Sequence, residues 1–333
     1  MQNDRVLVVG GGIVGCLSAI EIKKKGFDVS VVDQSSIGQQ SSWAAGGILF
    51  PLMPWDYSKE VYKLCFNSKN YYQKLAKELL QETGIDCELL CSSIAIKEPN
   101  NRDKILSWCS QNKMEINVNE KEIILKEIFQ IRPPRLMKAL RVFMKNLGIK
   151  IIENKKITNF HESDGKIKYC LSSEGDLFKA DIFILCSGAW ASSILKEYKD
   201  IVFPVKGQMI QYPNTSLNLK HIMYKNGFYL IPRKDGVLVA GSTLEKVGFN
   251  SEDCIKNINI LKRKAESLVP ELKKIEISKS WHGFRPGTEG NIPFIQKHKN
   301  NSNLLLNFGH YRYGIAMAPR AAQLITNLTH HLK

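Results

Sequence analysis

A glycine-rich turn near the start of the chain constrains the fold more than any other feature. The apolar residues 5–9 lead into Gly10, Gly12 and Gly15, which are spaced as G-x-G-x-x-G. Residues 13–25 have the pattern of a helix, and a second apolar run, residues 29–32, ends at Asp33. Strand, tight turn, helix, strand and acid follow one another in this order in a Rossmann unit. The sequence therefore predicts a bound dinucleotide.

Each residue of this motif has a physical task. Gly10 permits the tight turn, Gly12 lets the backbone approach a pyrophosphate, and Gly15 lets the helix pack closely on the strand. The N-terminus of the helix offers free N–H groups and a partial positive charge to the phosphates. Asp33 is placed for the ribose hydroxyls of the adenosine half, and its carboxylate disfavours a 2′-phosphate there.

Length and composition indicate a globular protein with a sizeable core. The chain has 333 residues, of which 44% are hydrophobic, and this excludes a disordered chain. No stretch is long and apolar enough to span a bilayer. The first predicted strand begins almost at once and leaves no room for a signal peptide, so we expect a cytoplasmic location.

The net charge and the cysteines raise two further possibilities, a nucleic-acid partner and a metal site. The formal net charge is +15, but the lysines are scattered and no basic arm or basic-aromatic stripe stands out. We therefore expect no nucleic-acid partner, and a charge that attracts small anionic substrates. The eight cysteines include no C-x-x-C pair, so we expect reduced core thiols and no metal.

The order of the predicted elements indicates a mixed α/β (α+β) fold. Dinucleotide-type segments occur at both ends of the chain and around residues 149–190, while the material between them is strand-rich. Helical patterns cover residues 57–84, 133–146 and 251–268, and a last helix runs to about residue 328. We expect a discontinuous Rossmann-like domain (1–84, 132–205 and 281–333) interleaved with an antiparallel-sheet substrate domain (85–131 and 206–280).

Four further blocks carry a family resemblance. They read WAAGGILFPLMPW (43–55), GFYLIPRKDGVLVAGSTLEKVGF (227–249), WHGFRPGT (281–288) and GHYRYGIAMAP (309–319). In this order and spacing, and together with the glycine motif, they resemble the D-amino-acid-oxidase-like flavoenzymes, and within these the glycine oxidases of thiamine biosynthesis. The resemblance implies FAD held without a covalent bond. Related sarcosine oxidases attach flavin through a Cys near the last block, and no Cys follows Cys254 here.

The resemblance also implies which residues contact FAD. The glycine motif and Asp33 match the ADP site, Ser41 and Ser42 the pyrophosphate contacts, and residues 45–48 a segment along the isoalloxazine ring, where small residues allow close approach. Residues 309–315 match a loop that brings N–H groups to the pyrimidine edge of the flavin. The expected FAD-binding residues are Gly10, Gly12, Ile13, Val14, Gly15, Asp33, Ser41, Ser42, Ala45, Gly46, Gly47, Ile48, Ile157, Gly188, Arg285, His310, Tyr311, Arg312, Tyr313, Gly314 and Ile315.

The substrate site implied by the resemblance depends on Arg285. This residue matches an arginine that clamps the substrate α-carboxylate, a role that suits a guanidinium because it binds carboxylates bidentately and stays charged. Tyr229 matches a tyrosine that contacts the same carboxylate, and Arg312 an arginine near substrate and flavin. Tyr224 lies in a segment expected to cover the pocket. We expect these four residues to be catalytic.

Three positions depart from the pattern of the family. The last block reads Arg312-Tyr313-Gly314 where Arg-Asn-Gly is usual, Gly290 lies in the stretch where an Asp is common, and Gln296 replaces a usual Gly. We expect these changes to affect flavin affinity or the tuning of the ring.

The resemblance implies oxidative deamination of glycine, or of other small amines and D-amino acids. The imine hydrolyses to glyoxylate and ammonia or passes to thiazole synthesis, and O₂ is reduced to hydrogen peroxide. Expected partners are glycine, O₂, thiazole synthase and further copies of the chain. Three alternatives stay open: a D-amino acid or sarcosine oxidase or dehydrogenase, the flavin domain of tRNA wobble-uridine modification, and a non-catalytic flavin module.

Overall fold

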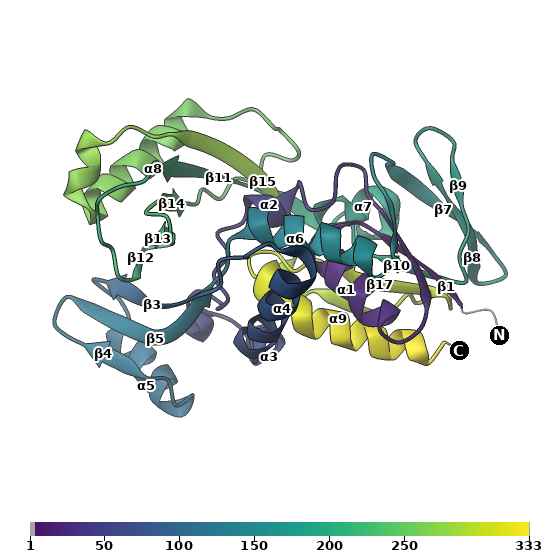
Figure 1. The fold of residues 1–333 in the computed structure, drawn as a ribbon, viewed down its shortest axis with the longest axis horizontal. Coiled ribbons are helices and arrows are strands. Elements are labelled where there is room, and N and C mark those ends of the chain that lie inside the picture. The colour runs from purple at the N-terminus through teal and green to yellow at the C-terminus, as the bar shows by residue number, and fades with distance from the viewer. Residues whose placement is uncertain (1–3, 333) are drawn as a thin grey trace.

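The computed structural model describes residues 4–332 and contains two large sheets and a small third one (Figure 1). The six-stranded sheet has the order β16-β17-β10-β1-β2-β6. Its central strands are parallel and apolar, as expected for strands buried on both faces, and β16 is an antiparallel edge. The bounds are β1 Arg5–Val9, β2 Asp28–Val32, β6 Lys150–Ile152, β10 Ile182–Leu185, β16 Phe294–Lys297 and β17 Leu304–Phe308.

Helices far apart in the sequence cover one face of this sheet. They are α1 (Ile13–Lys23), α4 (Ser68–Thr83), α6 (Pro133–Asn146) and α9 (Gly314–His330). Helix α6 starts with two prolines, which suit the first turn, and its buried residues recur every three or four positions. Helix α1 is buried on most sides because α9, from the other end of the chain, packs against it (Figure 1).

The eight-stranded sheet has the order β15-β11-β14-β13-β12-β3-β5-β4 and is antiparallel except between β12 and β3. Helix α8 (Ile255–Leu268) packs on one face of β11, β13 and β14. The bounds are β3 Leu90–Lys97, β4 Ile116–Val118, β5 Glu122–Gln130, β11 Phe203–Tyr212, β12 Ile222–Lys225, β13 Phe228–Pro232, β14 Leu238–Gly241 and β15 Lys279–Gly287.

A small antiparallel meander completes the strands and covers the second face of the six-stranded sheet. It consists of β7 (Ile157–Ser163), β8 (Lys166–Ser172) and β9 (Leu177–Phe178). The remaining helices are α2 (Ser41–Ala44), α3 (Lys59–Cys65), α5 (Arg102–Gln111) and α7 (Ala191–Ile194). The mixed α/β class expected from the sequence is confirmed.

Some elements differ from the expected pattern. The helical region at residues 57–84 consists of two helices, α3 and α4, because Asn67 between them has a positive φ of 63°. Helix α8 begins at Ile255 rather than near residue 251. Strands β11 and β15 pair with each other and extend across the expected domain boundaries at residues 205 and 280.

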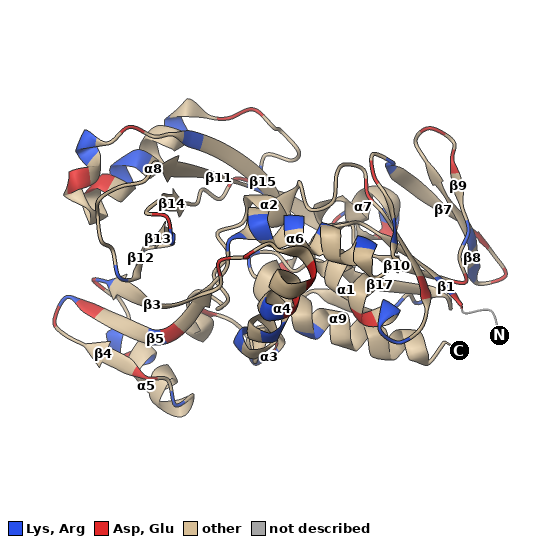
Figure 2. Cartoon of the chain, viewed as in Figure 1, with Lys and Arg blue, Asp and Glu red and all other residues tan. Residues whose placement is uncertain are grey.

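The described residues contain neither a membrane-spanning helix nor a cluster of metal-ligating side chains. Within residues 4–332, no helix has the length and apolar character needed to cross a membrane. In the same residues, no group of three or more His, Cys, Asp or Glu side chains is placed to hold a metal ion. Lysines and arginines are spread over many elements, with acidic residues between them (Figure 2).

Candidate active site

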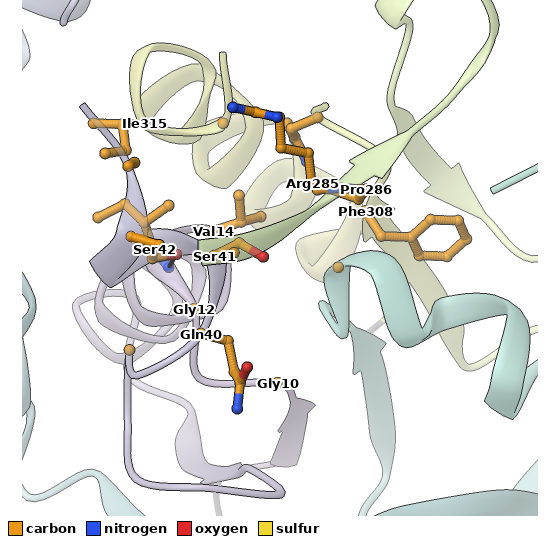
Figure 3. A pocket seen from close by; sticks show the side chains of 18 of the residues that line it. Gly10, Gly12, Val14, Gln40, Ser41, Ser42, Arg285, Pro286, Phe308 and Ile315 are labelled. Carbon is orange, nitrogen blue, oxygen red and sulfur yellow. Dashed lines mark hydrogen bonds between the residues drawn. The ribbon is translucent and has the colours of Figure 1, made fainter. Parts of the chain in front are cut away.

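A long cavity is lined by residues of both large sheets. The cavity extends from the glycine-rich turn along α2 to Arg285 and the start of α9 (Figure 3). Every residue that the sequence assigned to FAD or substrate borders it, with the exception of Gly15 and Tyr224.

The glycine-rich turn forms one end of the cavity. The N–H of Gly10 donates to the carbonyl of Val32 at 2.8 Å, and φ of Gly10 is +110°. A Cβ on Gly10 would lie 2.5 Å from the carbonyl oxygen of Cys186. A Cβ on Gly15 would overlap the carbonyl oxygen of Gly10. Gly15 therefore lets α1 approach the turn without bordering the cavity itself.

Asp33 is fixed by three hydrogen bonds beside this turn. Its Oδ2 accepts from the N–H of Gly11 at 2.6 Å, and its Oδ1 accepts from the N–H of Ser35 at 2.8 Å and the hydroxyl of Ser35 at 3.0 Å. Burial raises the pKa of the Asp33 carboxyl group, while the hydrogen bonds from Ser35 and Gly11 lower it. The carboxyl group is therefore held in one orientation at the wall of the cavity.

Ser41 and Ser42 connect the glycine-rich turn to the strand that carries Arg285. The first N–H of α1, on Ile13, donates to Oγ of Ser42 at 2.9 Å. The hydroxyl of Ser41 donates to the carbonyl of Phe284, the neighbour of Arg285. Figure 3 shows both serines between the glycine turn and Arg285. Their hydrogen bonds therefore connect the glycine-rich end of the cavity to the end that carries Arg285.

The segment after α2 has glycines at points of close approach. Gly47 has a φ of +77°, and a Cβ there would overlap the carbonyl of Ile131. A Cβ on Gly46 would lie 3.0 Å from Cδ1 of Ile231. Small residues are therefore required by the protein itself along this wall, independently of any ligand.

Sequence reasoning did not single out Arg233, which lies behind this wall. Its Nη2 donates to the carbonyl of Gly46 at 2.7 Å, and its Nη1 to Oε1 of Gln130 at 2.8 Å. Burial lowers the pKa of Arg233 to about 10, so the side chain remains a cation at neutral pH. The only sequence signal was its place in the Pro232-Arg233-Lys234-Asp235-Gly236 turn.

Three buried polar atoms on the cavity wall have no hydrogen-bond partner within residues 4–332. They are Oγ of Ser187, Oδ1 of Asn307 and Nε2 of His310. Burial lowers the pKa of His310 to about 3, so its ring is neutral. Buried polar groups are normally paired, and these atoms therefore fit a polar ligand. Together with the glycine turn, they fit an elongated dinucleotide such as FAD.

Arg285 lies at the other end of the cavity. Its Nη2 donates to the hydroxyl of Ser242 at 2.6 Å, and its Nη1 to the carbonyl of Thr243 at 3.2 Å. No carboxylate of residues 4–332 forms an ion pair with it. Burial lowers its pKa and nearby Tyr229 opposes this effect. A half-buried guanidinium that lines a cavity without an acidic partner is a site for an anion.

Of the other three expected catalytic residues, two line the cavity and one does not. Tyr229 is buried and lines it, as does Arg312. Tyr224 pairs across β12 and β13 with Tyr229 but does not line the cavity. Burial raises the pKa of Tyr224 and the charge of Arg312 lowers it, which places the two residues within electrostatic reach.

Of the three departures from the family pattern, Tyr313 borders the cavity. Gly290, with a φ of +62°, lies in a short turn at Glu289–Asn291, and Gln296 is exposed on β16. Neither Gly290 nor Gln296 contributes to the cavity wall. An effect of these two residues on a ligand would therefore have to be indirect.

Comparison with known proteins identifies the family. Residues 5–328 match the model of the FAD dependent oxidoreductase family. The chain is 33% identical to glycine oxidase of Pseudomonas putida, over 98% of this chain and 94% of the relative. It is 32% identical to the bifunctional protein ThiO/ThiG of a Synechocystis species, over 97% of this chain and 51% of that protein.

The fold agrees with solved structures of similar proteins. The structure of glycine oxidase from Geobacillus kaustophilus superposes with a TM-score of 0.90 at 24% identity, over 99% of this chain and 95% of that chain. That of L-proline dehydrogenase from P. horikoshii has a TM-score of 0.85 at 19% identity, over 98% and 93%. The sequence match over nearly the whole chain, with a cavity that fits a dinucleotide, shows that this protein belongs to the FAD dependent oxidoreductase family.

Proposed function

We propose that this protein oxidises glycine with FAD as its cofactor. The observation that carries the proposal is the half-buried guanidinium of Arg285, which lines the cavity without an acidic partner in residues 4–332. The α-carboxylate of a small amino acid satisfies this charge. The chain is similar to the glycine oxidases of P. putida and of Bacillus subtilis, and this similarity supports glycine as the substrate.

The residues that would hold FAD extend along the whole cavity. The turn at Gly10–Gly12, the N-terminus of α1 and Asp33 would hold the ADP half, and residues 45–48 and 310–315 would border the ring. When bound, FAD supplies the acceptor for two electrons and a proton from the Cα–H bond of the substrate. The neutral His310 and the backbone at the start of α9 add donor groups on that side of the cavity.

The protein side of catalysis is then mostly orientation. Arg285 and Tyr229 fix the carboxylate, which directs the Cα–H bond along the cavity toward the ring site. No carboxylate or neutral histidine is needed to remove the Cα proton. The overall reaction is glycine, O₂ and water giving glyoxylate, ammonia and hydrogen peroxide.

A second substrate class and a partner follow from the same site. Sarcosine and D-alanine share the carboxylate and amine of glycine, so both are candidates for the same clamp.

The Synechocystis relative named ThiO/ThiG contains a second part beyond the region matched here. We propose thiazole synthase as the partner that accepts the imine, with the protein in the cytoplasm. Arg285 lines this cavity without an acidic partner in residues 4–332, which favours a small carboxylate over tRNA as the substrate and disfavours a non-catalytic role.

The test is a spectrum of the purified protein followed by additions of substrate. We expect the visible bands of oxidised flavin, and their anaerobic bleaching by glycine. Oxygen uptake with glycine, sarcosine and D-alanine then ranks the substrates, and a quinone added without O₂ tests for a dehydrogenase. A colourless folded protein, or a flavin that no small amine bleaches, would contradict the proposal.

A further inference from the structure

Tyr313 makes a contact that the usual Asn at this position is too short to make in the same way. Its side chain is 5% exposed, and its hydroxyl donates to the carbonyl of Leu52 at 2.7 Å. The ring of Tyr57 packs edge-on against it, with centroids 5.2 Å apart and an interplanar angle of 83°. Tyr313 therefore connects the start of α9 to the segment around residue 52.

That segment has few other backbone restraints. Pro51 and Pro54 carry no N–H donor. In the described part of the chain, Phe50, Pro51 and Leu52 form no hydrogen bond with another backbone group, whereas Leu49 before them donates to Phe129 and Asp56 after them to Met53. The hydroxyl of Tyr313 thus holds the backbone in the middle of a segment that is otherwise fixed there only by side-chain packing.

The tyrosine itself sits on a rigid support. Its carbonyl accepts the N–H of Met317 at 2.8 Å in the first turn of α9, which begins at the next residue, Gly314. Helix α9 packs against α1 in the core. Because Tyr313 is anchored in this way, the position of Leu52 depends on the position of the start of α9.

The side chains held by this contact border the substrate end of the cavity. Phe50, Leu52 and Tyr313 line the same cavity as Arg285 and Tyr229. All of them except Arg285 belong to one hydrophobic cluster, which also contains Met209. A side chain on the α-carbon of a substrate held by Arg285 and Tyr229 would have to be accommodated beside this apolar wall.

We propose that Tyr313 is a specificity-determining residue, which holds Leu52 in place and so favours glycine over amines that carry a side chain. This inference rests on the proposed function. Tyr313 acts on the substrate through Phe50 and Leu52, so it is a positioning residue rather than a catalytic one. Loss of its hydroxyl frees the carbonyl of Leu52, and the cavity then accommodates a substrate side chain more easily.

The variant Tyr313→Phe tests this because it removes the hydrogen bond and keeps the ring. Tyr71→Phe is the control, since the hydroxyl of Tyr71 also donates a hydrogen bond of 2.8 Å, to Oε1 of Glu21, and neither Tyr71 nor Glu21 lines the cavity. In Tyr313→Phe, the ratio of kcat/KM for D-alanine to kcat/KM for glycine should rise about fivefold, the effect of one hydrogen bond. Tyr71→Phe should leave this ratio at the wild-type value.

A ratio that stays constant in Tyr313→Phe, or that shifts equally in both variants, would overturn the inference. If Tyr313→Phe does not fold, Leu52→Ala trims the wall directly and should shift the ratio in the same direction. If the ratio of the two kcat/KM values is also unchanged in Leu52→Ala, the proposal is contradicted.

Binding of carboxylates to the flavoprotein separates this inference from the proposed function. The affinities of acetate and butyrate, measured by perturbation of the visible flavin spectrum, need no turnover. Tyr313→Phe should improve butyrate relative to acetate by about fivefold, whichever amine the wild type oxidises. If glycine fails as a substrate but this change occurs, the proposed function is wrong and the role of Tyr313 stands. If glycine is oxidised but this change in carboxylate affinity is absent, the proposed function stands and the role of Tyr313 is wrong.

Discussion

The guanidinium of Arg285 lies directly against the backbone of Gly207, where a Cβ would overlap both of its terminal nitrogens. Gly207 is on β11 and Arg285 on β15, and these two strands pair along their whole length. The absence of a side chain at residue 207 therefore creates the space in which the guanidinium folds back toward Ser242. Its position depends on this glycine.

Gly207→Ala should displace Arg285 while the sheet stays intact. A misplacement of about 1 Å at a positioning group costs on the order of 100-fold in rate, so kcat/KM for glycine should fall by about that factor. Gly287→Ala on β15 is the control, because its Cβ would lie 2.5 Å from the ring of Phe203 and neither Gly287 nor Phe203 lines the cavity. Activity in Gly207→Ala equal to that of Gly287→Ala would contradict the assignment.

The glycine turn offers a second pair of variants with graded effects. In Gly15→Ala the new Cβ overlaps the carbonyl of Gly10, whereas in Gly12→Ala it lies 3.2 Å from Oγ of Ser42. Gly15→Ala should therefore lower the melting temperature by several degrees, as for a destabilisation of about 1–3 kcal/mol. Gly12→Ala should keep the fold and weaken FAD binding.

Both effects are measured on the same samples, by circular dichroism melting and by the ratio of flavin to protein absorbance. A Gly15→Ala protein with wild-type stability and full flavin content would show that α1 does not need its close approach to the turn. Unchanged flavin content in Gly12→Ala would contradict the prediction that the pyrophosphate binds at this end of the cavity.

His310 predicts how stability depends on pH. Burial lowers its pKa to about 3 in the folded protein, against about 6.5 in an unfolded chain. Between these values the unfolded state binds a proton that the folded state does not, so stability is lost as the pH falls below about 6.5, by up to about 1.4 kcal/mol per pH unit.

Urea unfolding of wild type and His310→Gln between pH 4 and 7 measures this contribution. The wild-type free energy of unfolding should decrease more steeply toward acid than that of the variant, and the difference between the two slopes isolates the histidine. Parallel slopes would mean that the ring is charged or exposed in the folded protein.

Sequence reasoning recovered the architecture of the nucleotide half because its signals are local. The turn at Gly10–Gly15 and the acid at residue 33 lie within one strand-helix-strand unit, and its order fixes the geometry. The helix α5 and the strands β4 and β5 in residues 101–131 were not predicted individually. In β5 the buried positions shift from residues 123 and 125 to residues 128 and 130, on either side of Glu127 with its positive φ of 53°, so no single two-residue period runs through the strand.

The residues missed in the site depend on contacts that are distant in sequence. Gly207 lies near Arg285 through the register of β11 on β15, which no local pattern reveals. Arg233 reaches Gly46 and Gln130 across 187 and 103 positions. A single Arg or Gly in a sequence is more often unremarkable, and only the fold distinguishes these two.

The most direct test of the carboxylate clamp is the concentration of glycine that half-bleaches the flavin without O₂, compared in wild type and Arg285→Ala. We expect Arg285→Ala to retain its flavin and to need at least about 100-fold more glycine, since it loses charged bidentate hydrogen bonds. Arg285→Lys should recover part of this loss, because it restores the charge without the fork. An unchanged half-bleaching concentration in Arg285→Ala would contradict the assignment of this residue as the carboxylate clamp.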